Sequence, residues 1–168
     1  MKAALILISL VVLIFAKEGR VKYIVDGDTL KLQNGVVLRF AHIDTPESKK
    51  NKRAKRFASL CRNTSLSEII KAGKLSSSFT KSLIAKNEVI DYDSISTDRY
   101  GRKVAVIYNS EGVNINEAII LQGYGVVYQR YTKGMKRVIY NKLQNKAKRE
   151  KNGLWISYPK IMQCLNLQ

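Results

Sequence analysis

Four carboxylates stand close together near the start of the chain, and their type and spacing are the first sign of chemistry in this sequence. The chain has only 13 Asp and Glu among 168 residues, yet Asp26, Asp28, Asp44 and Glu47 fall within 22 positions. Like charges brought together repel one another unless a cation lies among them. Oxygen ligands without a Cys or His partner favour a hard ion, Ca²⁺ or Mg²⁺. The alternative is that Asp26-Gly27 is only a hairpin turn and that residues 44–47 form a polar loop.

Two arginines add the chemistry of phosphate binding. Arg39 lies five residues before Asp44, between the apolar residues Leu38 and Phe40, and Arg102 ends the polar segment 94–102. A guanidinium gives two parallel hydrogen bonds to a phosphate and keeps its charge at any working pH. Beside a metal, two such groups would hold a phosphoryl group and the charge that develops on it. Taken singly, an arginine more often forms an ordinary surface ion pair.

The charge balance of the chain indicates an anionic partner. Lys and Arg number 30, which gives a net charge of +17. A fold gains nothing from such an excess, whereas an anionic polymer or surface would be attracted by it. Nucleic acid is therefore the leading class of partner, ahead of a membrane or an anionic polysaccharide. Two basic stretches, 49–62 and 130–151, flank the candidate acids, and binding through them should weaken steeply with salt.

The apolar pattern predicts the elements that must position these side chains. It alternates in three short segments between residues 20 and 43, with turn signals at Asp26-Gly27 and Asn34-Gly35, which predicts a three-stranded meander. The later periods predict a helix over 66–86, strands near 88–93 and 103–108, a short helix ending at 123 and a long helix ending near 153. The expected fold is mainly β with α: one domain, residues 17–168, built as a five-stranded oligonucleotide-binding (OB-fold) barrel with about three helices.

Four blocks of sequence carry a more specific signal. They are residues 25–32 (VDGDTLKL), Arg39 with 44–47 (DTPE), 97–102 (TDRYGR), and 116–118 (NEA) with Gln122-Gly123. Together with 78–81, 147–151 and Trp155, they closely resemble the staphylococcal nuclease (thermonuclease) family over roughly residues 21–155. Separated blocks in the same order, joined to a matching order of elements, are far more specific than one short motif.

The resemblance implies a secreted, Ca²⁺-dependent nuclease that hydrolyses the phosphodiester bonds of DNA and RNA with little sequence specificity and leaves 3′-phosphate and 5′-hydroxyl ends. It assigns Ca²⁺ to the carboxylates of Asp28 and Asp44 and to the backbone carbonyl of Thr45, with Asp26 behind them. It assigns removal of a proton from the attacking water to Glu47, and binding of the scissile phosphate to Arg39 and Arg102. Every role that metal-assisted hydrolysis needs then has a residue.

The resemblance is less even at the substrate-binding residues. Arg99 stands where the type member of the family has lysine, a change that keeps the charge but alters the geometry. Tyr100 is retained and is expected to hydrogen-bond the 3′ phosphate of the substrate, near which Arg99 keeps a positive charge. The paired tyrosines of the family map less cleanly, and Tyr128 and Tyr131 are the residues predicted to stack on a base. The alternative for both is packing over the barrel rim with the hydroxyl in water.

The N-terminus and the two cysteines concern the compartment. Residues 1–16 are a basic Met1-Lys2 pair followed by an apolar run that ends at Ala16, which is typical of a cleaved signal peptide. Export to periplasm, envelope or medium is therefore expected; the alternative is an uncleaved anchor, which would be the only contact with a membrane. Cys61 and Cys164 make an even pair, which favours a disulfide, although sequence cannot place their Cα atoms within bridging distance.

Two other classes of function stay open at this stage. A non-catalytic nucleic-acid-binding module of the same OB fold would bind without cutting. A cationic surface or membrane-active protein would explain the charge and the export, but not the acidic cluster. The enzyme is favoured because the acids, the base and both arginines are all present. A monomer without a stable protein partner is expected, while the preference for DNA or RNA and endo or exo action are not decided by the sequence.

Overall fold

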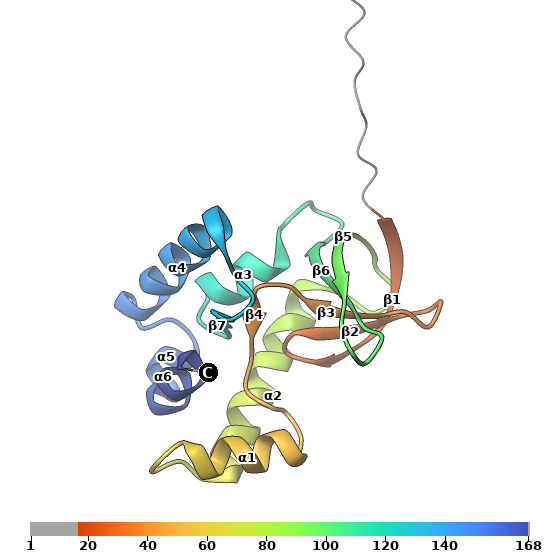
Figure 1. Cartoon of the computed structure of the whole chain (residues 1–168). Coiled ribbons are helices and arrows are strands. Elements are labelled where there is room, and N and C mark those ends of the chain that lie inside the picture. Colours follow the sequence, from red (N-terminus) through yellow and green to blue (C-terminus); the bar gives the residue numbers. More distant parts are fainter. Residues whose placement is uncertain (1–16, 168) are drawn as a thin grey trace, which may run out of the picture.

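A five-stranded barrel forms the centre of the protein. The computed structural model describes residues 17–167, and the predicted signal segment 1–16 lies outside the described residues. The barrel strands are β1 (Lys17–Asp26), β2 (Thr29–Leu32), β3 (Val37–Phe40), β5 (Val89–Thr97) and β6 (Lys103–Tyr108). They close in the order β1-β2-β3-β6-β5 (Figure 1). The predicted fold class, a mainly β OB-like barrel with helices, is confirmed.

The barrel follows from alternation along its strands. Leu30 and Leu32 of β2 and Leu38 and Phe40 of β3 are buried in one core cluster with Ile90 of β5, because alternate side chains of a strand face the same side. β1, β2 and β3 pair antiparallel as the predicted meander. β3 pairs with β6 in parallel, and this pairing brings Arg39 opposite Val104.

Six helices lie around the barrel in residues 17–167: α1 (Lys52–Leu60), α2 (Leu66–Leu83), α3 (Ile115–Leu121), α4 (Gly134–Arg149), α5 (Leu154–Ser157) and α6 (Pro159–Asn166). The sequence predicts α2, α3 and α4, but not α1, α5 and α6. α1 lies in the basic stretch 49–62, where only Ala54 and Phe57 of the helix are buried, so its apolar period is too short to detect. In this part of the chain, no helix is both long and apolar enough to span a bilayer.

A second, two-stranded sheet joins the barrel to the C-terminal part. It pairs β4 (Ile43–Asp44) antiparallel with β7 (Val126–Val127), so that Asp44 lies opposite Val126. In Figure 1 this pair lies between the barrel strands on one side and α4, α5 and α6 on the other. Strands of two residues leave no periodic signal, which is why the sequence does not predict this sheet.

A second apolar cluster holds α1, α2 and the C-terminal helices together. It contains Phe57, Ile69, Trp155 and Met162. Cys61, at the end of α1, is bonded to Cys164 of α6 with Cα atoms 5.9 Å apart, within the usual range for a disulfide. The predicted disulfide is confirmed, and it closes a separation of 103 residues.

Candidate active site

Arg39 lies between two buried carboxylates at one end of the barrel. Its Nη1 is 2.5 Å from Asp28 Oδ2, and its Nη2 is 2.8 Å from Asp44 Oδ1. All three side chains are at most 8% exposed. The guanidinium also donates to the backbone carbonyls of Asp28 and Ile43. Charges removed from water in this way must be paired, because an isolated buried ion costs several kcal/mol.

The barrel strands and the loop after β4 bring these groups together. Asp28 directly precedes β2, and its carbonyl accepts the N–H of Phe40 at 2.8 Å, next to Arg39 on β3. Thr45 follows Asp44, and both its backbone N–H and its hydroxyl donate to Asp28 Oδ2 at 3.0 Å. Burial alone would raise the pKa of Asp28, but the charges of Arg39 and Arg53 and the hydrogen bonds from its neighbours hold it below its ordinary value. Asp28 is therefore ionised in the folded protein.

Asp26 supports Asp28 from behind, as the sequence suggests. Its Oδ1 accepts the backbone N–H of Asp28 at 3.2 Å. Burial, followed by the negative charge of Asp28, raises the pKa of Asp26 to about 7. Below pH 7 the Asp26 carboxyl is therefore mostly protonated, whereas Asp28 is ionised and forms the ion pair with Arg39.

Glu47 joins the cluster through Arg53, a residue that the sequence assigns only to the basic stretch 49–62. Arg53, at the start of α1, reaches Glu47 Oε1 at 2.9 Å with Nη1 and Asp44 Oδ2 at 2.5 Å with Nη2. Asn51 donates to the other oxygen of Glu47 at 2.6 Å. The same Asn51 side chain caps α1 by accepting the N–H of Ala54. From the sequence, Arg53 belongs only to a basic stretch, and the one local signal, a helix cap at Asn51, does not tell where a long side chain points.

A face of small residues on α2 holds the backbone of the site. At Gly73 the helix touches the backbone of Pro46 and Glu47 so closely that a Cβ would clash with it. Ser76 donates to the carbonyl of Tyr124 at 2.7 Å, and Thr80 donates to the carbonyl of Gly27 at 2.7 Å. One helix thus fixes the Glu47 loop, the turn before Asp28 and the segment that leads into β7.

Arg102 is paired within its own loop. Its Nε and Nη2 both lie 2.7 Å from Asp98 Oδ2, and Asp98 also accepts the backbone N–H groups of Tyr100 and Arg102. None of the ion pairs found in residues 17–167 links Arg102 to Asp28, Asp44 or Glu47. The parallel register nevertheless places it two residues before Val104, the strand partner of Arg39. Arg102 itself directly precedes β6, the strand that pairs with the strand of Arg39.

The predicted substrate-binding residues lie at the surface and form two groups. Arg99 donates to the hydroxyl of Tyr100 at 2.7 Å and lies over its ring, with Tyr100 69% exposed. Tyr128 and Tyr131 meet edge to face with ring centroids 4.9 Å apart, and Tyr131 is 62% exposed. The N–H of Tyr128 donates to the carbonyl of His42, two residues before Asp44. The tyrosine pair is therefore tied to the segment that carries an acid of the site, and an exposed ring can accept a stacked base.

The donor chemistry at Asp28, Asp44 and Thr45 fits a hard cation. The available ligand atoms are the oxygens of two carboxylates and of one backbone carbonyl. Across the described residues 17–167, no three His, Cys, Asp or Glu side chains form a ready-made metal cluster. A cation here would therefore need the Thr45 carbonyl and water beside the two carboxylates. It would also meet an Asp44 whose oxygens both contact guanidinium groups.

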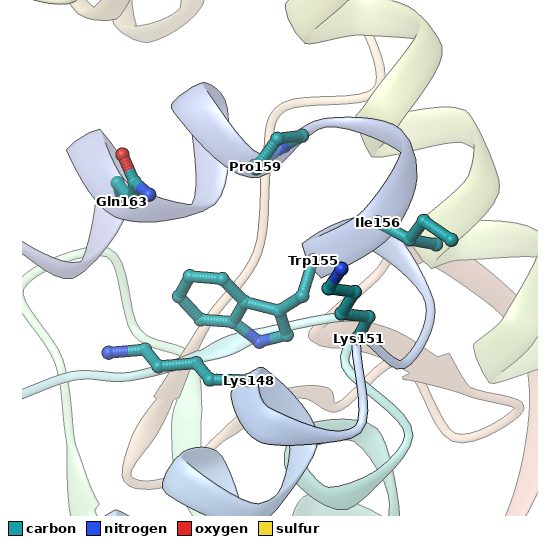
Figure 2. A pocket seen from close by; sticks show the side chains of 6 residues that line it. All are labelled: Lys148, Lys151, Trp155, Ile156, Pro159 and Gln163. Carbon is teal, nitrogen blue, oxygen red and sulfur yellow. The ribbon is translucent and has the colours of Figure 1, made fainter.

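A cavity of about 490 Å³ lies away from these acids, among the C-terminal helices (Figure 2). Lys148, Lys151, Trp155, Ile156, Pro159 and Gln163 line it. The ammonium of Lys148 lies 4.7 Å from the centre of the Trp155 ring. Removal from water lowers the pKa of Lys148. None of the predicted site residues lines this cavity, which lies beside the Trp155 side chain.

Comparison with known proteins gives a consistent result. The family model described as "Staphylococcal nuclease homologue" matches residues 37–157. An uncharacterized endonuclease of Escherichia coli O157:H7 is 30% identical over 142 residues, which cover 82% of this chain and 76% of that protein. The SPbeta prophage-derived endonuclease YokF of Bacillus subtilis is 30% identical over 135 residues, 78% of this chain and 41% of that protein. The endonuclease YhcR of the same species is 24% identical over 155 residues, 87% of this chain and 12% of that protein.

Proposed function

Since the chain belongs to the staphylococcal nuclease family, we propose that it hydrolyses the phosphodiester bonds of DNA and RNA with the help of Ca²⁺, leaving 3′-phosphate and 5′-hydroxyl ends. The observation that carries the proposal is the buried Arg39, held between Asp28 and Asp44 at the end of an OB barrel. Asp28 and Asp44 carry two negative charges, and Arg39 offsets one of them. An anionic substrate therefore needs further positive charge at this site, which a bound cation would supply. The names of the relatives support the nuclease class.

Each residue then has a role that its surroundings support. Arg39 presents fixed positive charge to the phosphate, and Arg102, steadied by Asp98, adds a second guanidinium as negative charge develops on the phosphoryl oxygens. Glu47, whose side chain keeps 16% of its surface exposed, takes a proton from the attacking water. Bound Ca²⁺ would offset the charges of Asp28 and Asp44 and polarise the phosphate.

The remaining residues orient the polymer. Arg99 and Tyr100 lie together on the loop that carries Arg102 and are suited to a neighbouring phosphate. Tyr128 and Tyr131 offer rings to a base, a contact that is indifferent to sequence because every base has a π face. The net charge of +17 draws nucleic acid towards the protein at a rate and strength that fall with salt.

A direct test is degradation of plasmid and single-stranded DNA by the purified protein with Ca²⁺ or with chelator. Glu47→Gln should lower the rate by at least about 10²-fold, since general base catalysis typically contributes 10² to 10⁴. Glu111→Gln is the matched control, because Glu111 is exposed and lies in a turn apart from the site. Its rate should equal that of the unchanged protein.

Other outcomes distinguish the alternatives. Tight binding of DNA without degradation in Ca²⁺ would support the non-catalytic binding module. Degradation that persists unchanged in chelator would contradict the role of the metal. Equal loss in both Glu variants would show that the assay responds to charge instead of to the base.

We also propose that the protein is exported. The support is the composition of residues 1–16 and the disulfide between Cys61 and Cys164, a bond that persists mainly in oxidising compartments. The mass and N-terminal sequence of the protein recovered from culture medium and cell fractions test this directly. An intact N-terminus in the cytoplasmic fraction would contradict export.

A further inference from the structure

We propose that Arg53 is a displaceable guanidinium latch, which pairs with oxygens of Asp44 and Glu47 and must leave when a divalent cation takes them. This inference rests on the metal dependence in the proposed function and adds a residue to it. Arg53 contacts Asp44 Oδ2 and Glu47 Oε1 at the same time, so one guanidinium links the proposed metal ligand to the proposed base.

Each carboxylate oxygen of Asp44 and Glu47 already has a partner in the protein. Asp44 uses Oδ1 for Arg39 and Oδ2 for Arg53. Glu47 uses Oε1 for Arg53 and Oε2 for Asn51. A cation that binds Asp44 through Oδ2 therefore competes with Arg53, and a base that must accept a proton from water is also held by it.

The two arginines differ in how firmly they are built in. The Arg39 side chain is 8% exposed and is held by two carboxylates and two backbone carbonyls. The Arg53 side chain is 48% exposed and lies in the first turn of α1, and within residues 17–167 its ion pairs are those with Asp44 and Glu47. Water and salt screen the exposed side of this guanidinium. Arg53 can therefore leave at a smaller cost than Arg39, which is buried and held by more groups.

The charge balance explains why the latch exists. Three carboxylates, those of Asp28, Asp44 and Glu47, face two guanidiniums in this cluster. Without Arg53 the acids would outnumber their single cation by two, and like charges would repel. A divalent cation would also offset this negative charge. The cation and Arg53 are therefore alternative partners for the same carboxylates.

The test measures binding of Ca²⁺ alone by isothermal titration calorimetry, without substrate. Arg53→Gln should bind Ca²⁺ about tenfold more tightly than the unchanged protein, equivalent to about 1.4 kcal/mol. Arg53→Lys keeps the charge but cannot bridge two carboxylates with a planar fork, and it should lie between them. Arg56→Gln removes an equal charge from an exposed position of the same helix, and its affinity should stay within twofold.

Thermal unfolding supplies a second readout that a purely structural role would not reproduce. In chelator, Arg53→Gln should melt below the unchanged protein, because Asp44 and Glu47 lose their partner. In saturating Ca²⁺ the two melting temperatures should converge. Equal or weaker Ca²⁺ binding by Arg53→Gln, or an equal gain in Arg56→Gln, would overturn the latch.

Two results separate this inference from the proposed function. Absence of Ca²⁺ binding by every variant at millimolar concentration would overturn both the latch and the metal role. Tighter binding by Arg53→Gln, in a protein that degrades no nucleic acid, would uphold the latch and overturn the proposed hydrolysis.

Discussion

The disulfide between Cys61 and Cys164 should contribute a large part of the stability of this protein. It joins the end of α1 to α6 across 103 residues. In the chain-entropy model, a crosslink over about 100 residues restricts the unfolded chain by about 4.7 kcal/mol at 25 °C. Whole domains unfold with only about 5 to 15 kcal/mol, so the bond is a substantial fraction of the total.

The expected loss on removing the bond is smaller than that limit. Without the bond, α1 and α6 still pack through Phe57, Met162 and Leu165 in the same apolar cluster. Unfolded chains are also more compact than the chain-entropy model assumes. We expect Cys61→Ala with Cys164→Ala to lose about 2–4 kcal/mol. With a urea slope of about 2 kcal/mol/M, the midpoint should fall by about 1–2 M.

The assay is urea unfolding of the unchanged protein with and without reductant, beside the double variant. Reductant should lower the midpoint of the unchanged protein to that of the double variant and leave the double variant unaffected. An identical midpoint in all samples, or two free thiols in the unreduced native protein, would refute the reasoning.

Three further changes test the fold around the site. Gly73→Ala should destabilise by about 1–3 kcal/mol in urea, because the new Cβ meets the backbone of Glu47; a gain of about 1 kcal/mol, the helix preference of alanine, would contradict this packing. Asn116→Ala should cost about 3 kcal/mol, because this buried amide donates to Ala41 and Ala105 and accepts from Ile107; a loss under 1 kcal/mol would contradict it. In chelator, Asp26→Asn should be more stable than the unchanged protein above pH 7. Folding raises the pKa of the Asp26 carboxyl from 3.8 to about 7, so its ionised form destabilises the folded protein. The advantage of Asp26→Asn should therefore disappear as the pH falls to about 4 and the carboxyl becomes protonated. That shift corresponds to about 4 kcal/mol in full, and to about half after allowance for partial exposure; parallel stability curves for both proteins from pH 4 to 8 would refute it.

The barrel could be predicted from the sequence because its signals are local. The turns at Asp26-Gly27 and Asn34-Gly35 and the alternation in each strand specify the meander without knowledge of the rest of the chain. The helix α2 was equally accessible, since Ser65 and Glu68 form a capping box before an apolar period.

The site could be predicted only in part. Asp28, Arg39 and Asp44 come together because strand pairing carries them there, and a motif resemblance can identify such residues. Arg53 reaches the acids with a long, flexible side chain from α1, a helix without a clear apolar period. The stretch 49–62 around it has the composition of an ordinary charged surface. The pairing of β4 with β7 depends on a contact between residues more than 80 positions apart, and two-residue strands carry no signal of their own.

The pairing of Asp44 with Val126 separates the completion of the barrel from the completion of the site. Every barrel strand has been synthesised by Tyr108, whereas the backbone partner of the acid comes 18 residues later. A fragment cut after Tyr108 would contain the whole barrel and both arginines of the proposed mechanism, but would leave this acid without its neighbouring strand. Split or circularly rearranged versions of the protein should therefore keep residues 43–44 and 126–127 in one folding unit, even where the barrel itself tolerates a break.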